Sequence, residues 1–227
     1  MADNPPRHEP PAPPSPEKPV RALHALGSGS NRFRLLLGLM PMPPRPPPSP
    51  PITGIWGVVV KVLGSFFGAG FLPLAPGTWG SLAALAIWFL GRDAAIAAGM
   101  TVGQMDVGCF LLSAIFAAAT LALGSLAERA AGRYDPPWFV LDELSGAFLA
   151  LYGLAGYNHA PLLLSAAGAF LLFRVLDATK LGVIGWADRR LTGGVGILMD
   201  DLFAGAVATL TVRGVAWLLF GLPPAAG

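Results

Sequence analysis

Cysteine, histidine and charge are all scarce in this sequence. The single cysteine among 227 residues, Cys109, excludes an intrachain disulfide and a zinc cluster built from thiolates. It lies in an apolar run without a following arginine loop, which disfavours a cysteine nucleophile. Two histidines, His8 and His24, lie in a proline-rich tail, and His159 lies in a predicted turn. A histidine nucleophile or a histidine-rich zinc site is therefore poorly supported.

The shortage of charge predicts a membrane protein. Charged residues make up 12% of the chain and hydrophobic residues 54%, with a mean hydropathy of +0.60, which is too apolar for an ordinary soluble domain. Residues 107–126 contain no Asp, Glu, Lys or Arg. At about 1.5 Å per residue this run matches a hydrocarbon core of roughly 30 Å, so we predict that it spans the bilayer.

The amino-terminal segment has a different composition. Residues 1–51 contain 16 of the 23 prolines, which favour extended polyproline II and bury too little apolar surface to offset the entropy of ordering. We predict a disordered, proline-rich tail at 1–51 and a helical membrane domain at 52–223. The tail has no continuous apolar stretch after a basic start, so a cleaved signal peptide is not expected.

The apolar runs of the domain predict an all-α, multi-helix membrane bundle with about four to five membrane-embedded helices. Several runs are short for a full crossing, so some helices are expected to be half-buried or packed inside the bundle. The candidate spans are 82–104, 107–126, 144–173 and 202–220.

Local signals refine this picture. Arg92 and Asp93 are expected to interrupt the first candidate span. The third run carries turn-forming residues near 156–161, which favours two short helices meeting at a hairpin. Residues 55–67 are expected to form a short helix at the membrane interface, and the Gly- and Pro-rich stretch 68–81 a loop.

The positive-inside rule predicts the orientation. With the basic amino-terminal side in the cytoplasm, the spans return the later basic residues to the same side. They bring Asp142-Glu143, Asp177, Asp200-Asp201 and the 68–81 loop there too. We therefore expect a multi-pass protein of the inner (cytoplasmic) cell membrane, with an active site facing the cytoplasm. The returning basic residues are Arg129, Arg133, Arg174, Lys180, Arg189 and Arg190.

Five acidic residues flank the long apolar runs. An isolated carboxylate beside hydrocarbon is costly unless it is paired, hydrated or bound to a cation, and hard oxygen ligands suit magnesium. The alternative is that these residues only cap helix amino termini and interact favourably with the helix dipole. The five are Asp142, Glu143, Asp177, Asp200 and Asp201.

Each acidic pair is expected to open a helix. Small residues follow one turn later, namely Gly146 after the first pair, and Ala204 and Gly205 after the second. Small side chains let another backbone approach closely, so they are expected to bring the two acidic pairs together.

Arg174, Asp177 and Lys180 are spaced three residues apart and are expected to share one helix face. They form either a structural ladder of ion pairs or a functional set. In the functional reading, Asp177 joins the metal cluster while the arginine fork and the lysine charge bind phosphate oxygens.

Two glycine-rich loops are candidate anion sites because their backbone N–H groups precede predicted helices. They are 72–81 and 193–196, and neither matches a Walker A loop or a dinucleotide fingerprint. Thr78 and Ser81 add hydroxyl groups to the first loop, although helix capping is the more ordinary role for Ser81.

Four motifs in this order resemble the phosphatidylglycerophosphatase A family. The resemblance covers most of residues 64–210. It implies an all-helical fold, an acidic metal site, and magnesium-dependent removal of the terminal phosphate of phosphatidylglycerophosphate. The sequence departs from the family after Lys180, where Leu181, Gly182 and Val183 stand in place of a proline-containing loop. The motifs are Gly68 to Ser81, Asp142-Glu143 with Gly146, Phe173-Arg174 with Asp177 and Lys180, and Gly193-Gly194-Val195-Gly196 with Asp200-Asp201 and Ala204-Gly205.

We therefore interpret the chain as a Mg²⁺-dependent lipid phosphatase whose partner is a membrane phospholipid and not a nucleic acid. The expected metal ligands and catalytic carboxylates are Asp142, Glu143, Asp177, Asp200 and Asp201. The expected phosphate-binding residues are Arg174, Lys180, Thr78, Gly77 and Ser81.

Two other functions use similar residues. A small transporter would place its acidic residues near mid-membrane along a cation or proton path, whereas here they flank the spans. A lipid-headgroup transferase of the CDP-alcohol type would carry an Asp-Gly-x-x-Ala-Arg pattern, which this sequence lacks.

Overall fold

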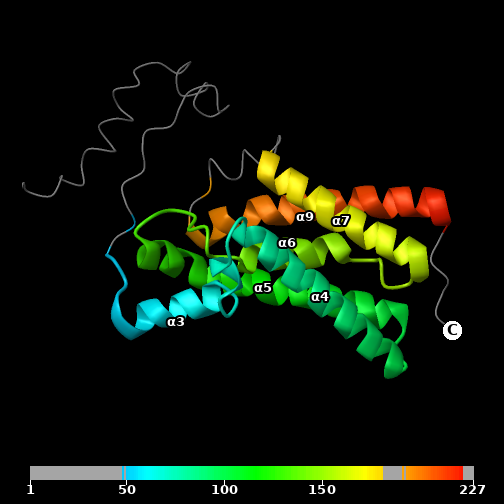
Figure 1. Ribbon diagram of the computed structural model, residues 1–227, viewed down its shortest axis with the longest axis horizontal. Helices are drawn as coiled ribbons and strands as arrows, with labels where there is room; N and C mark the ends of the chain where they lie inside the picture. The colour runs from blue at the N-terminus through cyan, green and yellow to red at the C-terminus, as the bar shows by residue number, and fades with distance from the viewer. Residues whose placement is uncertain (1–47, 49, 181–190, 192, 222–227) are drawn as a thin grey trace, which may run out of the picture. The chain divides into compact units, whose positions relative to one another are not determined.

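The computed structural model describes residues 48, 50–180, 191 and 193–221, and this part of the chain is all-helical (Figure 1). The tail predicted at 1–51 lies almost wholly outside the described residues, and so does the loop after Lys180. The elements are α3 (Gly54–Gly64), the 3-10 turn η1 (Ala69–Phe71), α4 (Pro76–Ala97), α5 (Val102–Ala131), α6 (Leu141–Leu151), α7 (His159–Thr179) and α9 (Gly193–Phe220).

Four helices, α4, α5, α7 and α9, are long and apolar enough to cross a membrane. The shorter α6 is enclosed by them (Figure 1). Leu144 and Phe148 of α6 have no exposed surface, and the ring of Phe148 stacks on that of Phe116 with centroids 5.7 Å apart. Ser113 and Ser145 each donate a hydrogen bond of 2.9 Å to the other's carbonyl oxygen, which fixes α6 against α5. The predicted membrane bundle is thus confirmed, with a short helix at its centre.

The predicted break at Arg92 and Asp93 is wrong, because α4 continues through both residues to Ala97. Arg92 is buried and donates hydrogen bonds to the carbonyl oxygens of Ala155 (3.0 Å) and Tyr157 (2.7 Å). From sequence alone, a charged residue inside an apolar run resembles a helix break, because its hydrogen-bond partners are not known. Here the turn between α6 and α7 supplies them.

The hairpin predicted within 144–173 is confirmed, since α6 ends at Leu151 and α7 begins at His159. Only α6 is short, however. The second helix, α7, has 21 residues and is one of the candidate spans.

The start predicted for the last helix is also wrong. Helix α9 begins at Gly193, so Asp200 and Asp201 lie about two turns inside it, and 193–196 is a helical turn and not a loop. These glycines serve close packing: a β-carbon at Gly194 would lie 2.7 Å from the carbonyl oxygen of Thr120 in α5. Their low helix propensity hid the first turns of α9 from sequence reasoning.

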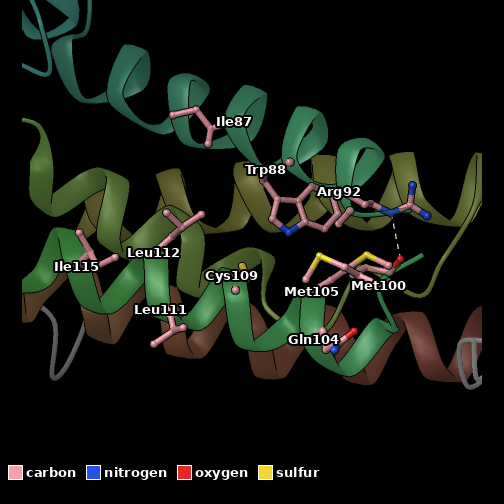
Figure 2. A pocket seen from close by; sticks show the side chains of 14 residues that line it. Ile87, Trp88, Arg92, Met100, Gln104, Met105, Cys109, Leu111, Leu112 and Ile115 are labelled. Atoms are coloured by element: carbon pink, nitrogen blue, oxygen red, sulfur yellow. Dashed lines mark hydrogen bonds between the residues drawn. The ribbon is translucent and has the colours of Figure 1, made fainter. Parts of the chain in front are cut away.

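Helices α4 and α5 leave an apolar cavity of about 330 Å³ between them (Figure 2). Its lining includes Trp88, Met105, Cys109 and Leu112, with Arg92 at one side. The cavity lies along the second half of α4, away from Pro76, where that helix begins. It is therefore separate from the acidic residues described next.

Candidate active site

Two acidic residues stand in the first turn of α6, as the sequence predicts. Asp142 and Glu143 follow Leu141, the first residue of the helix. The chain enters this helix along a fixed path, because Val140 donates a backbone hydrogen bond of 2.9 Å to the carbonyl oxygen of Gly64. Asp142 is nevertheless almost fully buried, which exceeds what a simple capping carboxylate needs.

Asp201 of α9 joins this pair. One side-chain oxygen each from Asp142, Glu143 and Asp201 can be chosen so that all three lie within 4.8 Å of one another. The approach depends on two glycines, since a β-carbon at Gly205 would overlap the carbonyl oxygen of Gly146. The expectation that small residues bring the acidic pairs together is confirmed for Asp142, Glu143 and Asp201.

Buried carboxylate oxygens in this cluster lack a hydrogen-bond partner among the described residues: Oδ1 of Asp142, Oε2 of Glu143, and Oδ1 of Asp200 and of Asp201. A buried charge without a partner is strongly destabilising unless it binds a proton or a cation. Burial raises the pKa of Asp142, and the negative charges of Glu143, Asp201 and Asp135 raise it further. Burial likewise raises the pKa of Glu143 to about 7. Converging hard oxygens with unused lone pairs fit a divalent cation such as Mg²⁺.

Asp200 faces a different partner from its neighbour. One of its oxygens accepts a hydrogen bond of 2.9 Å from Nζ of Lys180. Lys180 caps the carboxyl end of α7 in a left-handed conformation (φ 47°), which turns it toward α9. The expected place of Lys180 on the same helix face as Asp177 is wrong, because α7 ends at Thr179 and Lys180 lies in its left-handed cap.

Arg174 and Asp177 of α7 form an ion pair of 2.7 Å, so this step of the expected ladder is present. The pair also borders the carboxylate cluster. A β-carbon at Gly77 would overlap Oε1 of Glu143 and would lie 3.1 Å from Nη1 of Arg174. The start of α4, the arginine and Glu143 thus meet at one point.

The two hydroxyl residues of α4 differ in exposure. Thr78 lies half-buried in the first turn, which begins at Pro76. Ser81 is fully buried and donates a hydrogen bond of 2.9 Å to the carbonyl oxygen of Gly77. Helix capping by Ser81 is wrong, because Ala75 holds the cap position. Its role in binding phosphate stays a prediction, and its hydroxyl proton is already used.

Sequence reasoning missed Asp135. This exposed residue lies in the loop before α6 with a left-handed backbone (φ 44°), and its charge acts on Asp142. It sits between a tyrosine and Pro136-Pro137, where an aspartate resembles any polar loop residue. The one signal for Asp135 is its left-handed backbone conformation, which few residues other than glycine favour. This conformation is visible only in the structure.

The family model of phosphatidylglycerophosphatase A matches residues 62–216, which include every candidate site residue from Gly77 to Asp201. The chain belongs to the phosphatidylglycerophosphatase A family. This membership makes it a phosphoric monoester hydrolase and supports a lipid phosphatase role, in agreement with the acidic site.

Individual relatives agree with this assignment. A phosphatidylglycerophosphatase A of Escherichia coli (strain K12) is 32% identical over 142 residues, covering 63% of this chain and 74% of the relative. The one of Haemophilus influenzae is 32% identical over 162 residues, covering 70% and 91%. A putative phosphatidylinositol-3-phosphatase of Bacteroides thetaiotaomicron is 34% identical over 163 residues, covering 70% and 94%. No solved structure matches the chain significantly.

Within the phosphatidylglycerophosphatase A family, this chain is an integral membrane protein by its four candidate spans. The carboxylate cluster is assembled from the start of α6 and the early part of α9, while α4 contributes its first turn and α7 its last. The first turns of α4 and α6 and the last turn of α7 lie at the ends of their helices, whereas Asp200 and Asp201 lie about two turns inside α9. The cluster therefore lies nearer to one end of the bundle than to its middle (Figure 1).

Proposed function

We propose that the protein hydrolyses the terminal phosphomonoester of phosphatidylglycerophosphate, giving phosphatidylglycerol and phosphate, with Mg²⁺ as cofactor. The observation that carries this proposal is the group of buried, unpartnered carboxylate oxygens on Asp142, Glu143 and Asp201. Membership of the phosphatidylglycerophosphatase A family and the two relatives of that name support the choice of substrate.

Asp142, Glu143 and Asp201 would hold the cation, because their oxygens converge and remain unsatisfied. A bound Mg²⁺ supplies charge neutralisation for the phosphate and makes water a better nucleophile at neutral pH. Asp177 and Asp200 complete the acidic set, each already paired with a cationic side chain. One of the five carboxylates would accept the proton of the attacking water.

Positive groups beside the cluster would hold the phosphate. The planar guanidinium of Arg174 can donate two parallel hydrogen bonds to phosphate oxygens, and Asp177 fixes its orientation at 2.7 Å. Lys180 adds a point charge next to Asp200. Thr78 and the backbone at Gly77 lie where α4 begins, so its amino-terminal dipole favours the anion.

The site would face the cytoplasm from the inner membrane. Arg129 lies in the last turn of α5, Arg133 follows that helix, and Lys180 follows the end of α7, so positive charge collects at the end that carries the carboxylates. The positive-inside rule supports a cytoplasmic location for that end.

Phosphate release from phosphatidylglycerophosphate by the purified protein tests this proposal. With Mg²⁺ we expect turnover, and with EDTA none. Asp142→Asn and Asp201→Asn should each lower kcat about 100-fold or more, since the loss of one charge-stabilising group commonly costs this much. Asp93→Asn is the matched control, because Asp93 is a largely exposed carboxylate on the far part of α4. Activity that survives chelation would refute the proposal.

A phosphoinositide is a second candidate substrate. The Bacteroides thetaiotaomicron relative is named a putative phosphatidylinositol-3-phosphatase and covers as much of this chain as any relative above. Both substrates are phosphomonoesters on a lipid headgroup, so the same residues serve either one. Comparison of kcat/KM for phosphatidylglycerophosphate and for phosphatidylinositol 3-phosphate, in the same vesicles, decides between them.

A further inference from the structure

The loop between α3 and α4 holds apolar side chains in the open. Leu74 is 100% exposed and Phe67 is 75% exposed, and both have a left-handed backbone, with φ of 82° and 56°. Left-handed conformations are unfavourable for residues other than glycine. In water, exposure of two large apolar side chains is also unfavourable. The loop therefore keeps them exposed for an apolar partner.

The loop is held firmly in this position. Nε1 of Trp79 donates a hydrogen bond of 3.0 Å to the carbonyl oxygen of Pro73, immediately before Leu74. The ring of Phe71 stacks on Trp138 with centroids 5.8 Å apart. A β-carbon at Gly70 would overlap the carbonyl oxygen of Trp138. The exposed leucine is thus presented by a fixed scaffold.

The same scaffold leads directly into the candidate active site. Helix α4 begins at Pro76, two residues after Leu74, and a β-carbon on Gly77 would meet both Glu143 and Arg174. On the other side, Trp138 precedes the first turn of α6 by three residues. Leu74 is therefore three residues along the chain from Gly77, which forms a wall of the carboxylate cluster.

The surroundings of the loop identify its partner as lipid. Because α4 is a candidate span, its first turn lies where hydrocarbon meets the headgroups. Helix α3 exposes Ile55, Trp56 and Val58 beside Lys61. Together with Trp79 and Trp138, these residues have the composition of a membrane interface, with aromatic rings at headgroup depth and a cationic side chain.

We propose that Leu74 and its loop insert into the lipid headgroup region and contact the glycerol and upper acyl chain of the phospholipid whose phosphate enters the site. This inference rests on the proposed lipid substrate for its kinetic consequence only. The contact with the bilayer itself requires neither substrate nor Mg²⁺.

Fluorescence quenching tests the insertion. In a Cys109→Ala background, an environment-sensitive fluorophore is attached at Leu74→Cys, at Leu90→Cys and at Arg133→Cys, in the full-length chain reconstituted into phosphatidylcholine and phosphatidylglycerol vesicles. Leu90 is exposed in the middle of α4 and marks the hydrocarbon, whereas Arg133 is exposed beyond α5 and marks water. The label at position 74 should be quenched by lipids that carry a quencher near the headgroup. Quenching by aqueous iodide alone, as at position 133, would overturn the proposal.

Kinetics test the consequence for the substrate. Leu74→Gly removes the side chain and suits the left-handed backbone, so the fold is retained. Loss of the proposed contact between the leucine side chain and the lipid should raise KM for phosphatidylglycerophosphate in vesicles about fivefold, with kcat unchanged. Leu74→Met should restore KM, and Ile96→Ser, an exposed position at the other end of α4, should not change it.

The two arms separate the possible failures. If the label at position 74 contacts lipid but no phosphatidylglycerophosphate is hydrolysed, the proposed substrate is wrong and the insertion stands. If hydrolysis occurs and Leu74→Gly leaves KM unchanged, the substrate contact is wrong.

Discussion

Gly77 and Glu143 touch so closely that no side chain fits between them: a β-carbon on Gly77 would overlap Oε1 of Glu143. The first turn of α4 therefore forms one wall of the carboxylate cluster. The two residues are far apart in the sequence, and this contact joins the Gly/Pro-rich motif to the first acidic pair.

Gly77→Ala should abolish activity, because the added methyl group must displace Glu143 or the start of α4. Gly91→Ala is a matched control on the same helix, since a β-carbon there meets nothing within 4 Å. Phosphate release measures the activity of both variants, and thermal unfolding shows whether each one is still folded. Equal activity in the two would show that the contact does not shape the site.

Gly205→Ala should destabilise the protein by about 1–3 kcal/mol, because overpacking forces α9 away from the Gly146 carbonyl of α6. Gly214→Ala, also in α9 but with open space around the new β-carbon, should gain up to about 1 kcal/mol from helix propensity. Unfolding in detergent measures both changes in the free energy of unfolding. If both variants gain stability, the close crossing of α6 and α9 is wrong.

Lys180→Met should destabilise the protein by about 1–3 kcal/mol, because it leaves the buried Asp200 carboxylate without this cation. Adding Asp200→Asn should recover most of the loss, since the uncompensated charge is then gone. A double-mutant cycle on the free energy of unfolding measures the coupling between the two residues. Strictly additive effects would mean that the pair does not form.

Substitution of Arg174 should lower activity, whereas substitution of Arg92 should lower stability. Arg174→Lys keeps the charge but loses the planar fork, so kcat/KM should fall about 10- to 100-fold while the fold remains stable. Arg92→Ala should instead lose about 2–3 kcal/mol of stability, because it leaves the carbonyl oxygens of Ala155 and Tyr157 unpaired.

These two arginines are compared by activity per folded molecule alongside thermal unfolding. The expected result is a loss of activity for the Arg174 variant and of stability for the Arg92 variant. If the Arg174 variant lost stability and the Arg92 variant lost activity, the roles assigned to the two arginines would be wrong.

The sequence predicts the helical bundle and the place of the first acidic pair well, because both depend on local composition. Asp142 and Glu143 precede a long apolar run, and this pattern is sufficient to place them in a first helical turn. Gly146 and Gly205 also reveal the close helix crossing, since few other reasons favour glycine inside an apolar helix.

Three of the errors involve partners that are distant in the sequence. Arg92 reads as a break until the α6–α7 turn supplies its acceptors. Gly193 and Gly194 read as a loop until α5 is seen to require their small size. Lys180 reads as part of a helical ladder until its left-handed cap turns it toward Asp200. Tertiary contacts decide each case against local propensity.

Titration of Mg²⁺ into the metal-free, full-length protein tests the central claim most directly. Isothermal calorimetry should detect saturable binding, and Asp142→Asn, Glu143→Gln and Asp201→Asn should each weaken it at least about tenfold, because each removes one of the converging ligand oxygens. Asp93→Asn should bind as the unchanged protein does, since this carboxylate is mostly exposed on the far part of α4. Unaltered Mg²⁺ affinity in the variant that carries all three cluster substitutions would contradict the claim.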